Sequence, residues 1–361
     1  MKILFVSAFA SSRRSAYNTR LLRLKSGLEN CGVEADMLYL GDYFFKSPFL
    51  IKAANIPWIR REVRGYDAVH GGTDACFVLG LLKGFEEFTL IDDVHSLAQE
   101  DRAYIRGYSD VGRQLRFIER LIMDSVSFSR SDFFISCSGP IRDTLVARGI
   151  DMKRIDVIRN GVDTRLFRPK GFRRKNDRFV VCYAGAFQEW QGVENLVEAA
   201  RLLSTDRSIA FKVIGFRRED QTLKCKLARI LGARAELMDA VSQKELVDQL
   251  ALSNVLVIPR SRNIATRMAF PTKFAEYLAT GRPVIVTDVD ETATYVRKHG
   301  CGFVCSPEPE SIARAIMRAK EIPSEQLDEM GIRARSLAES NFDLRVIGRQ
   351  YFEFLDRVLS C

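Results

Sequence analysis

The chain has 361 residues, of which 47% are hydrophobic and 28% are charged, and this is the composition of a soluble globular protein with enough residues for two hydrophobic cores. Its longest apolar runs are far shorter than the ~20 residues of a membrane-spanning helix, so we expect no such helix. Residues 1–10 are predicted to form a buried strand rather than a secretory signal. The formal charge of +9 indicates an anionic partner. Specific nucleic-acid binding ranks last among such partners, because no motif of a nucleic-acid-binding module is present.

The eight cysteines are scattered along the chain without the paired spacing of a metal site. The closest pair, Cys301 and Cys305, is separated by strand-like residues and has no second pair to complete a zinc site. We therefore expect reduced thiols, a cytoplasmic protein and no metal.

Strand-like apolar runs alternate with helix-length segments in the first part of the chain. These runs lie at residues 3–9, 35–40, 67–72, 88–95 and 132–138. Such alternation predicts parallel strands that are covered by helices on both faces of the sheet.

A basic stretch at residues 165–178 interrupts this alternation, which then starts again. The later strand-like runs lie at residues 179–185, 211–215, 255–259 and 282–288. We expect an α/β protein with two Rossmann-like, doubly wound parallel-sheet domains, at 1–165 and 166–340. Residues 341–361 have apolar positions at helical spacing and are predicted to form a closing helix that could pack back on the first domain.

Five stretches of the sequence carry a family resemblance. They are residues 119–145, 158–169, 183–200, 241–260 and 271–288. In order and spacing they resemble glycosyltransferase family 4. The resemblance implies a GT-B fold, with an N-terminal acceptor domain that faces a C-terminal donor domain across a cleft. It also implies a UDP- or GDP-linked sugar as donor, transfer with retained anomeric configuration, no cofactor, and a glycan or lipid-linked acceptor in the synthesis of a surface glycan or glycolipid.

Glu276 lies in a predicted helix ahead of a Gly-Arg-Pro turn and a buried strand. The resemblance implies that it is the second of two glutamates separated by seven residues and that it binds the ribose hydroxyls, since a carboxylate can accept from two vicinal hydroxyls. The alternative is a glutamate that only stabilises the start of its helix. The position of the first glutamate holds Met268, which cannot accept a sugar hydroxyl, so the donor sugar is expected to bind other groups, such as backbone amides of residues 269–272.

Gly185 follows a predicted strand, where a missing side chain would let the backbone approach a phosphate. Ala186 and Gln191 stand where the family often has an arginine and a lysine that reach the diphosphate. The departing diphosphate still needs cations, and motif position gives four candidates: Lys273, Arg260, Arg262 and Arg267. The alternative for Lys273 is a surface pair with Glu276, one helical turn away.

His95 follows another predicted strand, where the family commonly has a histidine near the reacting sugar, and it is the candidate catalytic residue. A lone histidine is more often structural, but the motif position favours function. Asp93 could orient His95 or cap the next helix. Arg13 and Arg14, in the loop after the first strand, are candidates for phosphate or acceptor contact, with solvated loop charges as the alternative.

Residues 43–65 combine aromatic and basic side chains. Such a segment could lie at an anionic lipid surface and hold the protein at the inner face of the membrane. The alternative is that the aromatic residues pack in the core.

Two other functions remain open at this point. One is a catalytically silent GT-B protein that binds a nucleotide or a partner, which the residues Met268, Ala186 and Gln191 favour, because fold similarity does not establish chemistry. The other is a GT-B nucleotide-sugar epimerase.

Overall fold

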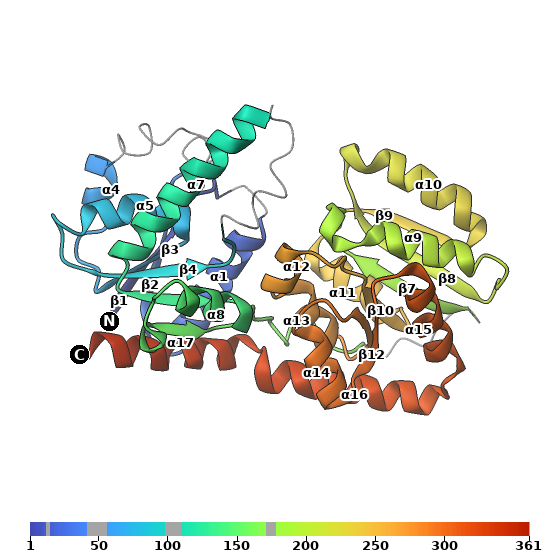
Figure 1. Ribbon diagram of the computed structural model, residues 1–361. Helices are drawn as coiled ribbons and strands as arrows, with labels where there is room; N and C mark the ends of the chain where they lie inside the picture. The colour runs from blue at the N-terminus through green and yellow to red at the C-terminus, as the bar shows by residue number, and fades with distance from the viewer. Residues whose placement is uncertain (12–14, 42–55, 98–109, 171–177, 361) are drawn as a thin grey trace. The chain divides into compact units, whose positions relative to one another are not determined.

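A computed structural model of the chain describes residues 1–11, 15–41, 56–97, 110–170 and 178–360 (Figure 1). It separates into two compact units, the first made of residues 1–161 and 344–361 and the second of residues 162–343. The chain thus enters the second unit after residue 161 and leaves it after residue 343, compared with sequence-based limits of 165 and 340. Each unit holds one six-stranded sheet, and the predicted α/β fold of two Rossmann-like domains is confirmed.

The first unit has a fully parallel sheet of order β2-β1-β3-β4-β5-β6. Its described strands are β1 (Lys2–Ser7), β2 (Glu34–Tyr39), β3 (Ala68–Gly71), β4 (Thr89–Val94), β5 (Phe133–Ser136) and β6 (Ile155–Val157). Its described helices are α1 (Ala16–Glu29), α4 (Ile56–Glu62), α5 (Thr73–Leu82), α7 (Asp110–Arg130), α8 (Gly139–Ala147), the 3-10 helix η1 (Met152–Arg154) and α17 (Leu344–Leu359).

Alternate residues of β1 belong to two different cores. Ile3 and Phe5 pack in the cluster that includes α1 and α17, whereas Leu4 and Val6 pack in the cluster that includes α4 and α5. Successive side chains of a strand point to opposite faces, so the sheet of this unit is covered on both faces, as a buried parallel sheet requires.

The last helix, α17, completes the first unit by packing against α1 (Figure 1). Gly27 and Gly348 allow a very close approach of the two backbones, because a Cβ built on Gly348 would lie 2.2 Å from the carbonyl oxygen of Gly27. The apolar residues whose helical spacing predicts this helix in the sequence form the face that contacts α1.

The second unit has a fully parallel sheet of order β12-β11-β10-β7-β8-β9. Its described strands are β7 (Phe179–Ala184), β8 (Ile209–Phe216), β9 (Ala235–Asp239), β10 (Val255–Ile258), β11 (Val284–Thr287) and β12 (Gly302–Cys305). Its described α-helices are α9 (Val193–Leu202), α10 (Gln221–Leu231), α11 (Gln243–Ala251), α12 (Ile264–Met268), α13 (Thr272–Ala279), α14 (Thr292–His299), α15 (Pro309–Glu321) and α16 (Ser324–Asn341). Short 3-10 helices, described as η2 (Glu189–Gln191), η3 (Arg218–Asp220) and η4 (Gly232–Arg234), lie between them.

Candidate functional site

Lys273, on α13, reaches the carboxyl end of β7. Its Nζ donates to the phenol oxygen of Tyr183 at 2.9 Å and to Oε1 of Gln191 at 2.9 Å, and it lies 4.2 Å from the centroid of the Tyr183 ring. Gly185 leaves the space that the ammonium group needs, because a Cβ at this position would lie 2.7 Å from Nζ. The structure therefore brings together Gly185 and Lys273, which the sequence singles out separately.

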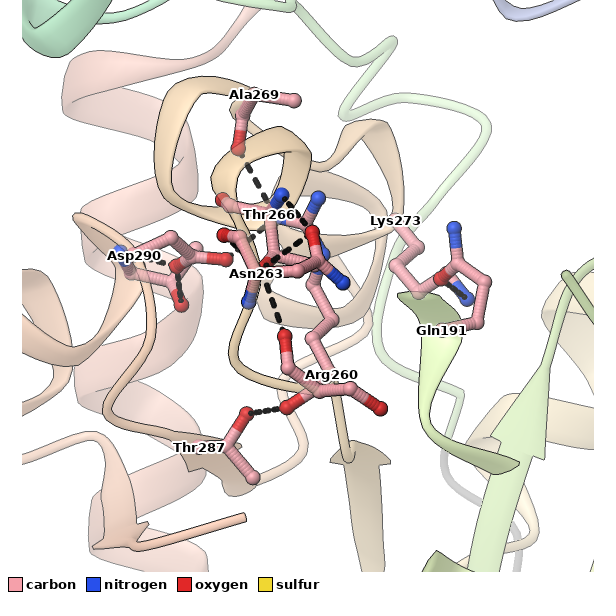
Figure 2. Close-up of polar contacts among 10 residues, drawn as sticks. Gln191, Arg260, Asn263, Thr266, Ala269, Lys273, Thr287 and Asp290 are labelled. Atoms are coloured by element: carbon pink, nitrogen blue, oxygen red, sulfur yellow. Dashed lines mark hydrogen bonds and ion pairs between the residues drawn. The ribbon is translucent and has the colours of Figure 1, made fainter. Parts of the chain in front are cut away.

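The partners of Lys273 are neutral, and no ion pair of this lysine occurs among the described residues. Figure 2 shows the contact with Gln191. Burial and the positive charge of Arg260 lower the pKa of Lys273 to about 7, and the negative charge of Glu276 offsets part of this effect. A cation that is short of water and of a counter-ion gains most from binding an anion, because the anion restores the charge that burial disfavours.

Glu276 is half-buried on the same helix, one turn after Lys273. The helix is fixed to the end of β7 by Tyr277, whose hydroxyl donates to the carbonyl oxygen of Ala184 at 3.0 Å and accepts from its amide at 2.7 Å. The helix begins after Pro271, with no side chain that caps its first amides. Uncapped amides at a helix start carry partial positive charge, so the helix start and Lys273 form one electropositive region.

Arg260 lies in a different environment. Its side chain is buried, and its Nη1 donates to Asp290 at 2.5 Å and to the carbonyl oxygens of Thr266 at 3.2 Å and Ala269 at 2.9 Å. These partners surround Arg260 in Figure 2, while Lys273 lies beside Gln191. Arg260 therefore holds α12 and the residue after it against the end of β11, while its Nε is buried with no hydrogen-bond partner among the described residues.

The other two arginine candidates are exposed. The side chain of Arg262 is 65% exposed and pairs with Asp288 at 3.2 Å. Arg267 is exposed in the last turn of α12. No described contact joins either arginine to Lys273.

Met268 is 5% exposed, so its side chain is packed inside the second unit. The amide of Ala269, one of the backbone donors considered for the donor sugar, already donates to the carbonyl oxygen of Ala265 at 3.0 Å. At the second departure from the family pattern, Gln191 accepts from Lys273, so the amide that stands where the family often has a lysine contacts a lysine of α13.

His95 lies at the end of β4 and helps to line a cavity of the first unit. Its ring stacks on Tyr17 with the centroids 4.4 Å apart, and its Nδ1 is 3.4 Å from the carbonyl oxygen of Asp93. The other polar residues of this cavity are not among those predicted from the sequence. Their position is the available signal, since Thr73 and Asp74 directly follow the strand-like run at 67–72.

The carboxylate of Asp93 does not contact the ring of His95 in any described bond. It pairs with Arg20 at 2.7 Å and with Nε2 of His70 at 3.3 Å, and Nδ1 of His70 bonds to the hydroxyl of Tyr351 on α17. Burial raises the pKa of Asp93, but Arg20 and His70 outweigh it and hold the pKa well below its usual range. These buried, hydrogen-bonded side chains tie α1, β3, β4 and α17 together close to His95, the residue that the sequence favours for catalysis.

Some predictions concern residues outside the described ranges. Arg13 and Arg14 lie there, as do residues 42–55 of the membrane segment. In the described part of that segment Trp58 is exposed, while Arg60 and Arg64 both pair with Glu86. Membrane contact through 43–65 stays a prediction.

Neither a metal site nor a membrane-spanning helix occurs among the described residues. No described group of three or more His, Cys, Asp or Glu side chains is arranged to hold a metal ion. None of the described helices combines the length and the apolar character needed to cross a bilayer.

Proteins of similar sequence or structure include several glycosyltransferases. The chain is 25% identical over 328 residues to an MMP alpha-(1->4)-mannosyltransferase of Mycolicibacterium hassiacum, which covers 87% of this chain and 76% of the relative. Its fold matches a sucrose-phosphate synthase of Thermosynechococcus elongatus with a TM-score of 0.79 at 17% identity, over 100% of both chains. It also matches Anabaena HepE, solved with UDP-glucose, with a TM-score of 0.74 at 17% identity, over 99% of this chain and 100% of the other.

Two family models match adjacent parts of the chain. The model of glycosyltransferase family 4 matches residues 26–166, and the model of the group 1 glycosyl transferases matches residues 165–337. Together with the two-sheet GT-B architecture, these matches show that the chain belongs to the family 4 and group 1 glycosyltransferases.

Proposed function

We propose that this glycosyltransferase moves a sugar from a UDP- or GDP-linked donor to an acceptor hydroxyl with retention of anomeric configuration, in the synthesis of a surface glycan or glycolipid. The observation that carries the proposal is the ammonium group of Lys273, which lies over Gly185 with neutral partners only. A diphosphate would supply the missing negative charge. The relative solved with UDP-glucose supports a nucleotide sugar as the donor.

In this proposal, different groups of the second unit bind different parts of the donor. Lys273 and the uncapped start of α13 bind the diphosphate, and Gly185 allows its close approach. Glu276, one turn later on the same helix, accepts hydrogen bonds from the ribose hydroxyls. Arg260 positions α12, and Arg262 and Arg267 have at most a peripheral role.

The reaction breaks the bond between the anomeric carbon and the oxygen of the diphosphate, and it forms a bond between that carbon and the acceptor oxygen. The proton of the acceptor hydroxyl ends on the departing diphosphate. Lys273 stabilises the negative charge that develops on this leaving group, since a cation already in place needs no reorganisation. In this scheme His95 orients the sugar or the acceptor, and no residue of the chain forms a covalent intermediate.

Calorimetric titration with UDP, GDP and ADP tests the proposal. We expect UDP or GDP to bind to the wild type and to bind more weakly to Glu276→Ala. The same nucleoside without phosphates should lose affinity by a similar factor, because Glu276 contacts the ribose. No binding of any nucleotide to the wild type would reject the donor site. NMR of the product formed from the matching nucleotide sugar then tests retention through the anomeric configuration.

Binding without transfer or donor hydrolysis would instead favour the silent protein. One observation supports that alternative: the position of the first glutamate holds Met268, which carries no carboxylate and is packed inside the second unit.

A further inference from the structure

Tyr183, the fifth residue of β7, has its side chain fully buried at the end of the strand. Its hydroxyl donates to the carbonyl oxygen of Ala186 at 2.5 Å and accepts from Nζ of Lys273 at 2.9 Å. Burial raises the pKa of Tyr183, so the phenol keeps its proton. Because a hydroxyl has only one proton to give, and Ala186 accepts it, the phenol oxygen serves Lys273 as an acceptor.

The ring of Tyr183 also contacts the ammonium group of Lys273. Nζ lies 4.2 Å from the ring centroid, a distance at which a cation is attracted to an aromatic face. Gly185 leaves room on the other side, because a Cβ there would lie 2.7 Å from Nζ and 3.5 Å from the phenol oxygen. The ring, the hydroxyl and the missing side chain of Gly185 together fix where the ammonium group lies.

Glu276 is the charged residue that could compete for Lys273. It follows three positions later on α13, and oppositely charged side chains at this helical spacing attract each other. The negative charge of Glu276 raises the pKa of Lys273, so the two side chains interact electrostatically. The hydrogen bonds of Nζ nevertheless go to Tyr183 and Gln191, and the described residues include no carboxylate in ion-pair contact with Lys273.

An ion pair between Lys273 and Glu276 would oppose nucleotide binding. In the proposed function the lysine binds the diphosphate and the glutamate binds the ribose. If the two side chains paired with each other, both contacts with the nucleotide would first require that pair to break, and the free energy of the pair would be lost from binding.

We infer that Tyr183 is a positioning residue that holds the ammonium group of Lys273 over Gly185 and away from Glu276. This keeps the lysine and the glutamate ready for two different parts of the nucleotide, and to that extent the inference rests on the proposed function. Gln191 is the second acceptor of Lys273, but it is only half-buried and lies in the three-residue helix η2. The buried phenol is therefore the firmer of the two contacts.

Tyr183→Phe tests the inference, since it removes the hydroxyl and keeps the ring. The probes are UDP and uridine, or GDP and guanosine if only GDP binds the wild type, titrated by calorimetry at pH 6.5, where the ammonium group is charged. We expect Lys273 to turn to Glu276 in the variant. The Kd should then rise by about three- to tenfold for the nucleotide and also for the nucleoside, although the nucleoside has no phosphate.

A second substitution distinguishes positioning from a general structural effect. In Tyr183→Phe with Lys273→Met, no ammonium group remains to pair with Glu276, so uridine should again bind within about twofold of the wild type. A loop that was merely distorted by the loss of the bond to Ala186 would not be repaired by removing Lys273. Persistent loss of uridine binding in the double variant would therefore overturn the inference.

The titration of Lys273 without any nucleotide gives an independent readout. NMR of the protein with ¹³C-labelled lysine measures it, and the signal of Lys273 is the one missing from Lys273→Met. In the wild type the pKa is about 7. In Tyr183→Phe it should rise if Lys273 pairs with Glu276, and adding Glu276→Gln should abolish the rise. Loss of the phenol acceptor without such pairing would lower the pKa instead, because the ammonium form would lose a hydrogen bond.

Tyr66→Phe is the matched control, because Tyr66 donates to Asp36 in the first unit; its uridine affinity and the pKa of its Lys273 should equal those of the wild type. The inference fails if the pKa of Lys273 does not rise in Tyr183→Phe, or if this variant binds uridine as tightly as the wild type, which would leave Gln191 as a sufficient holder. A wild type that binds no nucleotide would reject the proposed function alone, and the NMR titration would still decide whether Tyr183 keeps Lys273 from Glu276.

Discussion

Arg260 and Lys273 are two cations of the second unit that the sequence treats alike and the structure separates. Arg260 is buried against Asp290 and two carbonyl oxygens, so its charge is already paired with a carboxylate of the protein. Lys273 has a phenol and an amide as partners, so its charge lacks a counter-ion. Exposure alone does not identify a ligand-binding cation, since the well-exposed Arg262 is also paired. The charge of the partners distinguishes Lys273 from the two arginines.

Among the substitutions at these cations, we expect Arg260→Met to lower stability most. This change leaves the buried carboxylate of Asp290 without its cation, and breaking a buried pair in this way costs about 3–5 kcal/mol. We expect a strongly lowered melting temperature, measured by calorimetry.

A second change serves as the control for Arg260. Arg260→Met with Asp290→Asn removes both charges and should recover much of the lost stability. If Arg260→Met instead melted like the wild type but no longer bound UDP, Arg260 would be a ligand contact and the contrast with Lys273 would be wrong.

Lys273→Met should affect binding more than folding. Hydrogen bonds to a charged group are worth about 1.5–3 kcal/mol, so the Kd for UDP should rise roughly 10- to 150-fold, as measured by calorimetry. Uridine, which has no phosphate, should bind both proteins within about twofold. Equal loss for uridine would mean that Lys273 does not contact the phosphates.

The contact with Gln191 offers a rescue of this variant. Oε1 of Gln191 lies 2.9 Å from Nζ of Lys273, so a lysine at 191 can place its ammonium group in nearly the same position. Gln191→Lys in the Lys273→Met background should recover about tenfold of the lost affinity for UDP. No recovery would contradict the view that α13 supplies the cation missing from the loop.

Much of the fold can be predicted from the sequence because its signals are local. The apolar run at 179–185 contains β7 (Phe179–Ala184), and the run at 3–9 overlaps β1 (Lys2–Ser7). A buried parallel strand needs a short continuous apolar segment between turns, and this can be recognised without knowledge of its neighbours.

The site could be predicted only in part, because its contacts join distant residues. Lys273 is 90 residues from Tyr183 and 82 from Gln191, and Asp290 is 30 residues beyond Arg260. The sequence gives the type and motif position of these residues but not their partners. The same holds for Tyr17 and Thr73, whose lack of a hydrogen bond has no counterpart in any spacing.

The pH dependence of UDP binding gives a smaller and more specific effect. Burial and Arg260 lower the pKa of Lys273 to about 7 in the free protein, whereas a bound diphosphate would raise it by favouring the charged form. Binding must then take up a proton above pH 7, so affinity should fall by up to about tenfold per pH unit between pH 8 and 9.5. The terminal phosphate, with a pKa near ~6, is already ionised in this range.

Lys273→Arg provides the control for this pH dependence. Arginine keeps its charge throughout the range, so its affinity for UDP should be nearly constant between pH 8 and 9.5. A constant affinity in the wild type would contradict the lowered pKa of the free lysine or its contact with the phosphates.

The smallest effect is expected for Arg262→Ala. Its guanidinium is well exposed and pairs with Asp288 at the surface, and such pairs contribute about 0–1 kcal/mol to stability. We expect the melting temperature to stay close to that of the wild type and the Kd for UDP to change by less than about twofold. A rise in Kd as large as that of Lys273→Met would show that an exposed, paired arginine can bind the donor, and partner identity would then no longer separate the cations of this unit.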